Sequence, residues 1–354
     1  MNSSLIVFRR LVNSAMLLAL IVIGLGVYTR LTDAGLGCPD WPGCYGKLTA
    51  PLHEEHIAKI QQKFPNAVVE PHKAHNEMLH RYIAGLLGLL VLSIFLLSLV
   101  IKRWRKFGVL LLALIIMQAL LGMWTVTLNL IPLVVMAHLL GGFFLLGLLA
   151  LLRLDIFNAQ YSLATEPELR RFLPLAYIAA TFLLMQIALG GWTSANYAAL
   201  VCTQLPVCDA GWQTRFSLES IFHLPLGHET YEYGVLSYDA RMSIHVAHRV
   251  GAMMTTLIVA LLLMCSWRNA KTAGMRRLVL TIGLLLVTQI GLGIANIYWQ
   301  LPLANAVAHN LVAANLLMLT LVFIRQLHLR TRTGALTENS ITKVAMGASQ
   351  SVVN

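Results

Sequence analysis

Long runs of apolar residues recur eight times along the chain, and the polar and charged residues gather between them. A helix needs about 20 apolar residues to cross a hydrocarbon core of roughly 30 Å. Each of the runs is close to that length. The pattern therefore predicts eight membrane-spanning helices, at residues 10–28, 82–101, 107–127, 132–152, 172–193, 243–266, 277–297 and 303–325.

The composition supports this interpretation. Hydrophobic residues make up 58% of the 354 positions and charged residues only 12%, which is far more apolar than a soluble domain. Arg9 and Arg10 precede the first run, and no small-residue cleavage site follows it, so we expect this helix to be retained. The chain is thus predicted to be an all-α integral membrane protein that crosses the lipid bilayer several times.

Lysine and arginine residues are distributed unevenly between the two ends of the predicted helices. They fill the turns after the second and sixth runs, whereas the hairpins near Asn129 and Gln300 contain none. Because short cytoplasmic loops collect these residues, both termini are predicted to be cytoplasmic. This topology, with attraction to anionic lipid, accounts for the net charge of +11, so the charge does not indicate a nucleic-acid partner.

Four histidines occupy matched places in the two halves of the chain. They are His80 with His248, at an offset of 168 residues, and His138 with His309, at an offset of 171. Glycines, glutamines and cysteines repeat around them. A glycine lies twelve residues before the first cysteine of each long outer loop, and another lies four residues after a glutamine in the third helix of each half. These residues are Gly26, Gly190, Cys38, Cys202, Gln118, Gly122, Gln289 and Gly293.

The duplication predicts a particular architecture. We expect two four-helix halves, residues 1–155 and 172–330, joined by a cytoplasmic linker at 156–171 and followed by a flexible cytoplasmic tail at 331–354. Since each half has an even number of helices, both halves have the same orientation, related by a pseudo-twofold axis along the membrane normal. The four histidines are then predicted to lie toward the extracytoplasmic side, each near the outer end of its helix.

Paired imidazoles at membrane depth indicate haem. A single interior histidine is as often a hydrogen-bonded structural residue, but ionisable groups in membrane spans are costly and mark function by default. Neutral imidazoles that ligate haem iron avoid most of this cost. Zinc fits less well, because only two nitrogen ligands per half are available. We therefore predict haem iron bound by His80 and His138 in one half, and by His248 and His309 in the other.

The neighbours of these histidines distinguish the halves. Arg81 and Arg249 each follow a histidine, where a guanidinium either clamps a haem propionate or extends to the membrane surface. Glu77 lies on the same helical face as His80, whereas His245 stands at the corresponding place in the second half. A carboxylate in one half only predicts that this half does chemistry while the other stores or transfers an electron. A solvated acidic residue at a helix start is the plainer alternative.

Four of the five cysteines lie in the outer loops, where oxidation is permitted. Their equal spacing predicts disulfides between Cys38 and Cys44 and between Cys202 and Cys208. A structural staple and a redox-active role for the first pair both remain open. In the same first loop, residues 52–64 have apolar positions spaced for an amphipathic helix on the membrane surface.

Several of these features together resemble a known family. The segment 30–46, the Glu77-x-x-His80-Arg81 motif and the three other placed histidines are similar to haem A synthase, a bacterial and mitochondrial family that serves cytochrome oxidase assembly. The resemblance extends over about residues 9–330. The absence of a transit peptide favours a bacterial member, and hence the cell inner membrane.

The resemblance implies an oxidoreductase that acts on a methyl group. It implies oxidation of the C8 methyl of haem O to the formyl group of haem A through hydroxylated intermediates, with bound haem b as electron-transfer cofactor. This is the last step of haem A biosynthesis for cytochrome c oxidase. It assigns substrate haem O to His80 and His138, catalysis to Glu77, and haem b to His248 and His309. Haem O synthase and the cytochrome c oxidase assembly machinery are the implied partners, and a homo-oligomer is left open.

Two other interpretations are possible. A dihaem b-type electron-transfer subunit of the membrane also needs four histidine ligands, but it explains neither the asymmetry at Glu77 nor the cysteine loops. A transporter of haem or of a small solute, built from parallel repeats, explains the duplication but predicts no tightly bound haem.

Overall fold

The computed structural model describes residues 3–51, 57–58, 60, 62, 69–161 and 164–350, with side chains described up to residue 330. Within this part, the strand-like pairing is limited to one isolated bridge between Cys44 and Lys47. The helices are α1 (Ser3–Leu31), α3 (Pro71–Ile101), α4 (Arg105–Thr127), α5 (Pro132–Asn158), the 3-10 helix η1 (Pro167–Phe172), α6 (Leu173–Ala195), α7 (Trp212–Arg215), α8 (Leu218–Phe222), α9 (Tyr238–Asn269), α10 (Ala273–Tyr298) and α11 (Leu303–Gln350).

Eight helices in the described residues are long and apolar enough to cross a membrane, which confirms the predicted all-helical membrane fold. Several of them begin earlier than predicted, among them α1 at Ser3, α3 at Pro71 and α9 at Tyr238. The first turns of α3 and α9 carry polar side chains, so the apolar run in the sequence starts after the helix has begun. Groups of the outer loops form hydrogen bonds with some of these polar side chains. As a result, His80 lies inside its helix rather than before it, and His248 lies further from its helix start than predicted.

Two predicted segments are not tested by the structure. The amphipathic helix at 52–64 falls mostly outside the described residues. The backbone of α11 continues to Gln350, well past the predicted end of the last membrane segment. The flexible tail at 331–354 stays a prediction.

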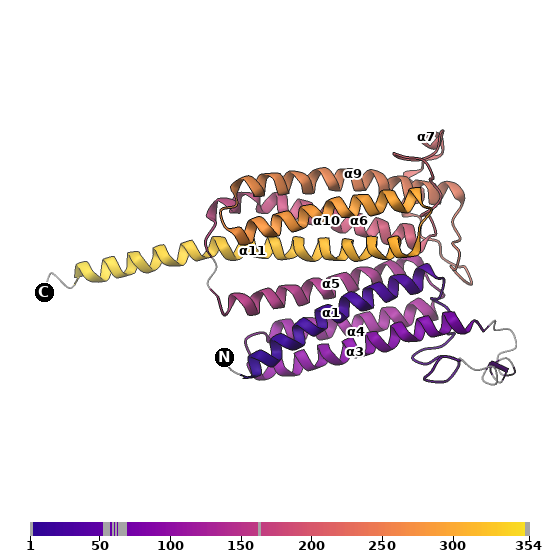
Figure 1. Cartoon of the computed structure of the whole chain (residues 1–354), viewed down its shortest axis with the longest axis horizontal. Helices are drawn as coiled ribbons and strands as arrows, with labels where there is room; N and C mark the ends of the chain where they lie inside the picture. The colour runs from indigo at the N-terminus through magenta and orange to yellow at the C-terminus, as the bar shows by residue number, and fades with distance from the viewer. Residues whose placement is uncertain are drawn as a thin grey trace.

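The membrane-spanning helices lie in two neighbouring groups, α1, α3, α4 and α5 in one and α6, α9, α10 and α11 in the other (Figure 1). In the first group α1 packs against α3 and α5, and α4 packs against α3 and α5. The second group repeats this arrangement, with α6 against α9 and α11, and α10 against α9 and α11. Across the boundary α5 contacts α6 and α11, and α1 contacts α11.

Small residues bring the two groups close together. Gly147 on α5 faces Leu321 of α11, and Gly191 on α6 faces Met136 of α5, so that the side chains fill space that a Cβ atom would occupy. Small residues at helix contacts are typical of membrane proteins, where packing rather than the hydrophobic effect drives helix association. Polar contacts reinforce the boundary at one end, where the Arg325 guanidinium makes a bidentate pair with Asp155 on α5.

Unusual backbone conformations, like the helix contacts, recur at equivalent positions in the two groups of helices. Residues other than glycine seldom adopt a positive φ, because the side chain then crowds the backbone. Six residues of this protein adopt a positive φ, between 50° and 64°, at matched places in the two groups. In the two hairpins these are Asn129 and Leu130, which match Gln300 and Leu301. After the first helix of each group, Asp33 matches Tyr197. The same local strain is therefore retained in both groups.

Both chain termini lie at the same end of the molecule as the α3–α4 and α9–α10 turns (Figure 1). The long loops that follow α1 and α6 lie at the opposite end. This arrangement matches the segregation of lysine and arginine in the sequence. Which end faces the cytoplasm stays a prediction.

A buried ion pair ties the segment between α5 and α6 to α11, at the end of its membrane-spanning part. Arg330 lies 3.4 Å from the Glu166 carboxylate, and the two residues are only 7% and 2% exposed. Glu166 also accepts hydrogen bonds from the hydroxyl of Thr272 and, at 2.8 Å, from the backbone N–H of Lys271. The pair therefore holds three separate segments together at this end of the protein.

We predict that Glu166→Ala destabilises the protein by about 3–5 kcal/mol, because Arg330 remains buried without its partner. Thermal unfolding in detergent measures the effect. Glu168→Ala is the matched control, since Glu168 pairs with Lys271 on the exposed surface, and exposed pairs contribute little. Equal unfolding temperatures for the two variants would contradict the structural role assigned to the buried pair.

Candidate functional site

Each of the four repeated histidines lies against a glycine of the neighbouring helix. The pairs are Gly26 of α1 with His80 of α3, Gly122 of α4 with His138 of α5, Gly190 of α6 with His248 of α9, and Gly293 of α10 with His309 of α11. A Cβ atom on these glycines would stand 3.0, 3.4, 3.0 and 3.3 Å from the imidazole Cε1, respectively. Three of these distances are shorter than ordinary van der Waals contact, and the fourth, at Gly122, is at its lower limit, so a side chain at Gly26, Gly190 or Gly293 would press against the imidazole.

The structure brings the histidines together in two pairs. His80 and His138 are close enough to interact electrostatically, and so are His248 and His309. The four side chains are partly exposed rather than sealed in the core. Each group of helices therefore presents two imidazoles that a ligand could reach.

Glutamines support the histidines from the neighbouring helices. The Gln289 amide nitrogen lies 3.2 Å from Nε2 of His309. The Gln186 amide nitrogen lies 2.9 Å from Nδ1 of His248 and donates to the carbonyl oxygen of the same residue. Gln118 is buried near His138, and its amide nitrogen has no partner in the described part of the chain. Glutamine amides therefore contact the imidazoles in two of the four helix pairs, α6 with α9 and α10 with α11.

Gln186 is not among the residues predicted from the sequence, although the sequence contains a signal for it. A glutamine lies four residues before the glycine in three of the four glycine-bearing helices: Gln118 with Gly122, Gln186 with Gly190, and Gln289 with Gly293. The α1 helix has Val22 at this position instead. His80 is therefore the one repeated histidine that lacks such a glutamine.

The donor set fits haem better than a free metal ion. Among the described residues, no three His, Cys, Asp or Glu side chains gather as they would around a metal. Structural zinc needs four protein ligands, whereas haem brings its own four nitrogen atoms and needs only axial ligands. The Nδ1 atoms of His80, His138 and His309 are buried and have no partner in the described part. Unused imidazole nitrogen atoms, two in the first group and one in the second, match axial ligation.

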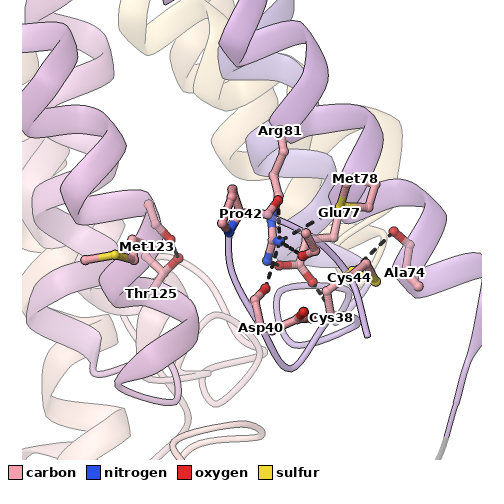
Figure 2. A network of polar contacts seen from close by, with 12 residues as sticks. Cys38, Asp40, Pro42, Cys44, Ala74, Glu77, Met78, Arg81, Met123 and Thr125 are labelled. Atoms are coloured by element: carbon pink, nitrogen blue, oxygen red, sulfur yellow. Dashed lines mark hydrogen bonds and ion pairs between the residues drawn. A yellow bond between two sulfur atoms is a disulfide. The ribbon is translucent and has the colours of Figure 1, made fainter. Parts of the chain in front are cut away.

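In the first group, Glu77 and Arg81 connect α3 to the disulfide loop (Figure 2). One oxygen of the Glu77 carboxylate accepts the backbone N–H of Cys38 at 2.8 Å. The other oxygen pairs with the Arg81 guanidinium, one helical turn further along. Arg81 also donates to the carbonyl oxygens of Asp40, at 2.9 Å, and of Gly43.

The second group repeats this connection with a different acceptor. The Cys202 backbone N–H points to Nδ1 of His245 at 3.3 Å, and Arg249 Nε lies 3.2 Å from Nε2 of the same ring. Arg249 further donates to the carbonyl oxygens of Gln204 and Val207 at 2.6 and 2.7 Å, and to that of Cys202. Both arginines thus hold their disulfide loops against the helix.

The two acceptors differ in what they can satisfy. An ionised carboxylate accepts on both oxygens, so Glu77 satisfies both of its donors. A neutral imidazole has one acceptor nitrogen, so His245 can accept from Cys202 or from Arg249, but not from both at once. The equivalent networks therefore have different charges. The first group has a neutral ion pair, and the second has a cation that makes no ion pair among the described residues.

The cysteines form the two predicted disulfides, Cys38 with Cys44 and Cys202 with Cys208, which confirms these pairings. Cys38 also lies directly over α3, where its Sγ is 3.8 Å from the carbonyl oxygen of Ala74. The neighbouring Tyr45 is buried, and burial followed by the negative charge of Glu77 raises the pKa of its phenol. The first disulfide loop therefore packs closely on the helix that carries Glu77 and His80.

The structure does not test the other roles predicted for these residues. It shows the guanidinium groups of Arg81 and Arg249 directed to loop carbonyl oxygens, and contact with haem propionates stays a prediction. The same holds for ligation of haem iron by the four histidines and for catalysis by Glu77.

Comparisons with known proteins agree on one family. The COX15-CtaA family model, described as "Cytochrome oxidase assembly protein", matches residues 9–321. The chain is 47% identical to the heme A synthase of Shewanella oneidensis over 89% of its own length and 94% of the relative. It is 26% identical to the heme A synthase of Wolbachia pipientis from Culex pipiens, over 83% and 90% of the two chains. The heme A synthase of Bacillus licheniformis is 24% identical, over 82% and 85%.

We predict that Arg81→Met loosens the loop between Cys38 and Gly46. Hydrogen exchange of the loop amides should accelerate by about tenfold or more, because a hydrogen bond to a charged group contributes about 1.5–3 kcal/mol. Arg249→Met should do the same to the loop between Cys202 and Cys208, and each variant should leave the other loop unchanged. Lys47→Met is the control, since that side chain is exposed on the first loop. Unchanged exchange in Arg81→Met would refute the assigned role.

Proposed function

This chain belongs to the COX15-CtaA family of cytochrome oxidase assembly proteins, and on that premise we propose that it has the haem A synthase activity of its relatives. The reaction would oxidise the C8 methyl of haem O to the formyl group of haem A through hydroxylated intermediates. The observation that carries this proposal is the pair of partly exposed imidazoles in each group of helices. The family assignment favours it over a dihaem electron-transfer subunit.

We propose that the two helix groups are tandem four-helix halves related by a pseudo-twofold axis along the membrane normal. The pattern of helix contacts supports this axis. Exchanging the equivalent helices turns the α5–α6 contact into the α11–α1 contact, and both contacts are present. The halves would comprise residues 1–155 and 172–330, with the linker at 156–171 on the same side of the membrane as both termini.

The first half would bind the substrate. His80 and His138 would hold haem O, and Gly26 and Gly122 would leave room for their rings. The absence of a glutamine partner for His80 in the described structure supports this assignment, because a ligand to a substrate must be released after each turnover. A ring without a fixed hydrogen bond can turn away more easily.

The second half would bind haem b, which supplies one-electron redox chemistry when present. His248 would be a permanent ligand, because contacts of the Gln186 amide with Nδ1 and with the carbonyl oxygen of His248 fix the orientation of its ring and its backbone. His309 would be the second ligand and is supported by Gln289. Such supporting amides are characteristic of ligands that must keep one geometry.

Glu77 would act in the first half as the group that positions water or moves a proton beside the reacting methyl group. It lies one helical turn from His80, on the same face of α3. Its carboxylate is oriented by the Cys38 N–H and by Arg81. A side chain held on both oxygens is well placed to keep one orientation through repeated turnovers.

We propose a location in the cell inner membrane, with both termini cytoplasmic and the disulfide loops on the oxidising side. The eight apolar helices support the membrane location, and the segregation of lysine and arginine supports the orientation. Haem O synthase and the assembling cytochrome c oxidase are the proposed partners, because they would supply the substrate and use the product.

We predict that the histidine pairs differ in which haem they retain. After co-expression with a haem O synthase, His248→Ala should lose nearly all haem b. His80→Ala should keep haem b but yield no hydroxylated or formyl product. Glu77→Gln should keep haem b and lower product formation by about 10²–10⁴-fold, the usual contribution of a positioned acid or base. Extraction and mass analysis of the bound haems measures these outcomes.

His328→Ala is the matched control for these variants. His328 lies on α11 and hydrogen-bonds Tyr177, away from the repeated positions, so its loss should change neither haem. Two equivalent haem b molecules in the unmodified protein, with no haem O derivative, would instead establish the dihaem electron carrier. A protein that retains no haem would favour the transporter.

We predict that glycine variants separate the two halves. Gly26→Ala should lower the content of haem O derivatives several-fold and spare haem b, because the added Cβ displaces the His80 ring. Gly190→Ala should lower haem b content instead. Gly24→Ala is the control on the same helix as Gly26, since its Cβ would meet Leu311 at an ordinary 3.7 Å. If both Gly26→Ala and Gly190→Ala reduced both haems equally, independent sites in the two halves would be ruled out.

A further inference from the structure

A cavity of about 510 Å³ lies at the end of the molecule where both termini are found. The α3–α4 turn, the end of α5 and the α11 helix line it, so that it touches both groups of helices (Figure 1). Its ionisable lining consists of five cations and a single carboxylate: Lys102, Arg103, Arg105, Lys106, Arg325 and Asp155.

The positive charge of this cavity is largely uncompensated. Asp155 is already engaged in its bidentate pair with Arg325. Arg103 lies over the ring of Trp104, 5.3 Å from its centroid. Lys102, Arg105 and Lys106 form no ion pair within the described part of the chain. An anion that entered the cavity would therefore meet three cations that are not engaged in ion pairs with the described residues.

A second, independent feature points to a ligand. Asn158 lines the cavity, and both its amide nitrogen and its amide oxygen are buried without a hydrogen-bond partner in the described structure. Such groups are rare in folded proteins because their desolvation is costly. A ligand that accepts one hydrogen bond and donates another would satisfy both atoms. A phosphate oxygen next to a hydroxyl group has this chemistry.

The surroundings favour a lipid over a soluble anion. Trp104 and Phe107 line the cavity together with the cations. Just outside it, Val100, Val109 and Leu110 are 73%, 49% and 55% exposed on α3 and α4. In a membrane-spanning helix such apolar surface faces acyl chains. The cavity thus combines an exposed basic rim and a hydrogen-bonding amide with an apolar approach from the bilayer.

We propose that this cavity binds the headgroup of an anionic phospholipid that carries a phosphodiester and a free hydroxyl, as phosphatidylglycerol does. Lys102, Arg105 and Lys106 bind the phosphate, and Asn158 bonds the headgroup. Basic pockets between membrane helices are suited to such headgroups. Since α5 and α11 belong to different groups of helices, the bound lipid stabilises the boundary between them.

The full-length protein in a neutral detergent provides the test. We expect short-chain phosphatidylglycerol to raise its unfolding temperature with a saturable dependence on concentration, because a ligand that binds only the folded state stabilises it. Short-chain phosphatidylcholine, at the same concentration, should give no such rise. Inorganic phosphate at matched ionic strength should also give none. A rise with phosphate alone equal to that with the lipid would overturn the assignment to lipid.

Two variants locate the binding. Arg105→Gln with Lys106→Gln should weaken phosphatidylglycerol binding by about 30-fold, as expected for two basic residues next to an anionic lipid. The matched control is Arg268→Gln with Arg277→Gln, which removes two exposed cations from the equivalent turn of the second group. If both double variants weakened phosphatidylglycerol binding equally, the effect would come from general surface charge, and a specific site would be refuted.

Asn158→Leu separates a ligand site from an empty cavity. Without lipid, removal of two unsatisfied buried atoms should leave the unfolding temperature unchanged or raise it. With phosphatidylglycerol, the same variant should lose much of the lipid-induced rise. An unchanged lipid response in Asn158→Leu would exclude the proposed role of this amide. Native mass spectrometry, which should show phosphatidylglycerol retained by the unmodified protein and lost from the double variant, provides a second readout.

Discussion

The contact between a histidine ring and the backbone of a glycine on the next helix determines how this protein is built. It occurs four times, and each time it joins two consecutive membrane helices of one group. An imidazole is polar and would be costly in hydrocarbon unless it has a partner. Its position against a bare backbone lets the helices approach closely while the ring edge remains accessible. The spacing of the helices and the accessibility of the ligands therefore have the same cause.

The two groups of helices use this arrangement with different chemistry one turn away. A carboxylate in the first group and an imidazole in the second occupy the same place, between a cysteine N–H and an arginine. Each of these side chains contacts the outer loop of its own group, so the loop is attached to the helix in both groups. The carboxylate alone can accept from both donors, and it alone brings a negative charge. Differences in activity between the halves can thus arise while the scaffold is conserved within the chain.

Much of this could be read from the sequence, because apolar length and repetition are strong signals. Eight spans, the paired histidines and both disulfides follow from them. The start of α3 was placed too late, since its first turns are polar and their partners lie in a distant loop. The contact of Arg30 with the α6 end is not apparent from any local pattern: it donates to the Ser194 carbonyl at 2.6 Å and lies over the ring of Tyr197. Such long-range contacts depend on how the groups pack, which neither periodicity nor spacing reveals.

The charge difference between the networks bears on the direction of electron flow in the proposed reaction. Glu77 neutralises Arg81, whereas Arg249 makes no ion pair within the described residues and feels only a more distant attraction from Asp209. A positive charge near a redox centre favours its reduced form, and the effect is large where the dielectric constant is low. The centre in the second half would therefore accept electrons more readily than an identical centre in the first. In the proposed reaction, the exchange of one carboxylate for one imidazole would therefore bias the two halves toward the roles of donor and acceptor.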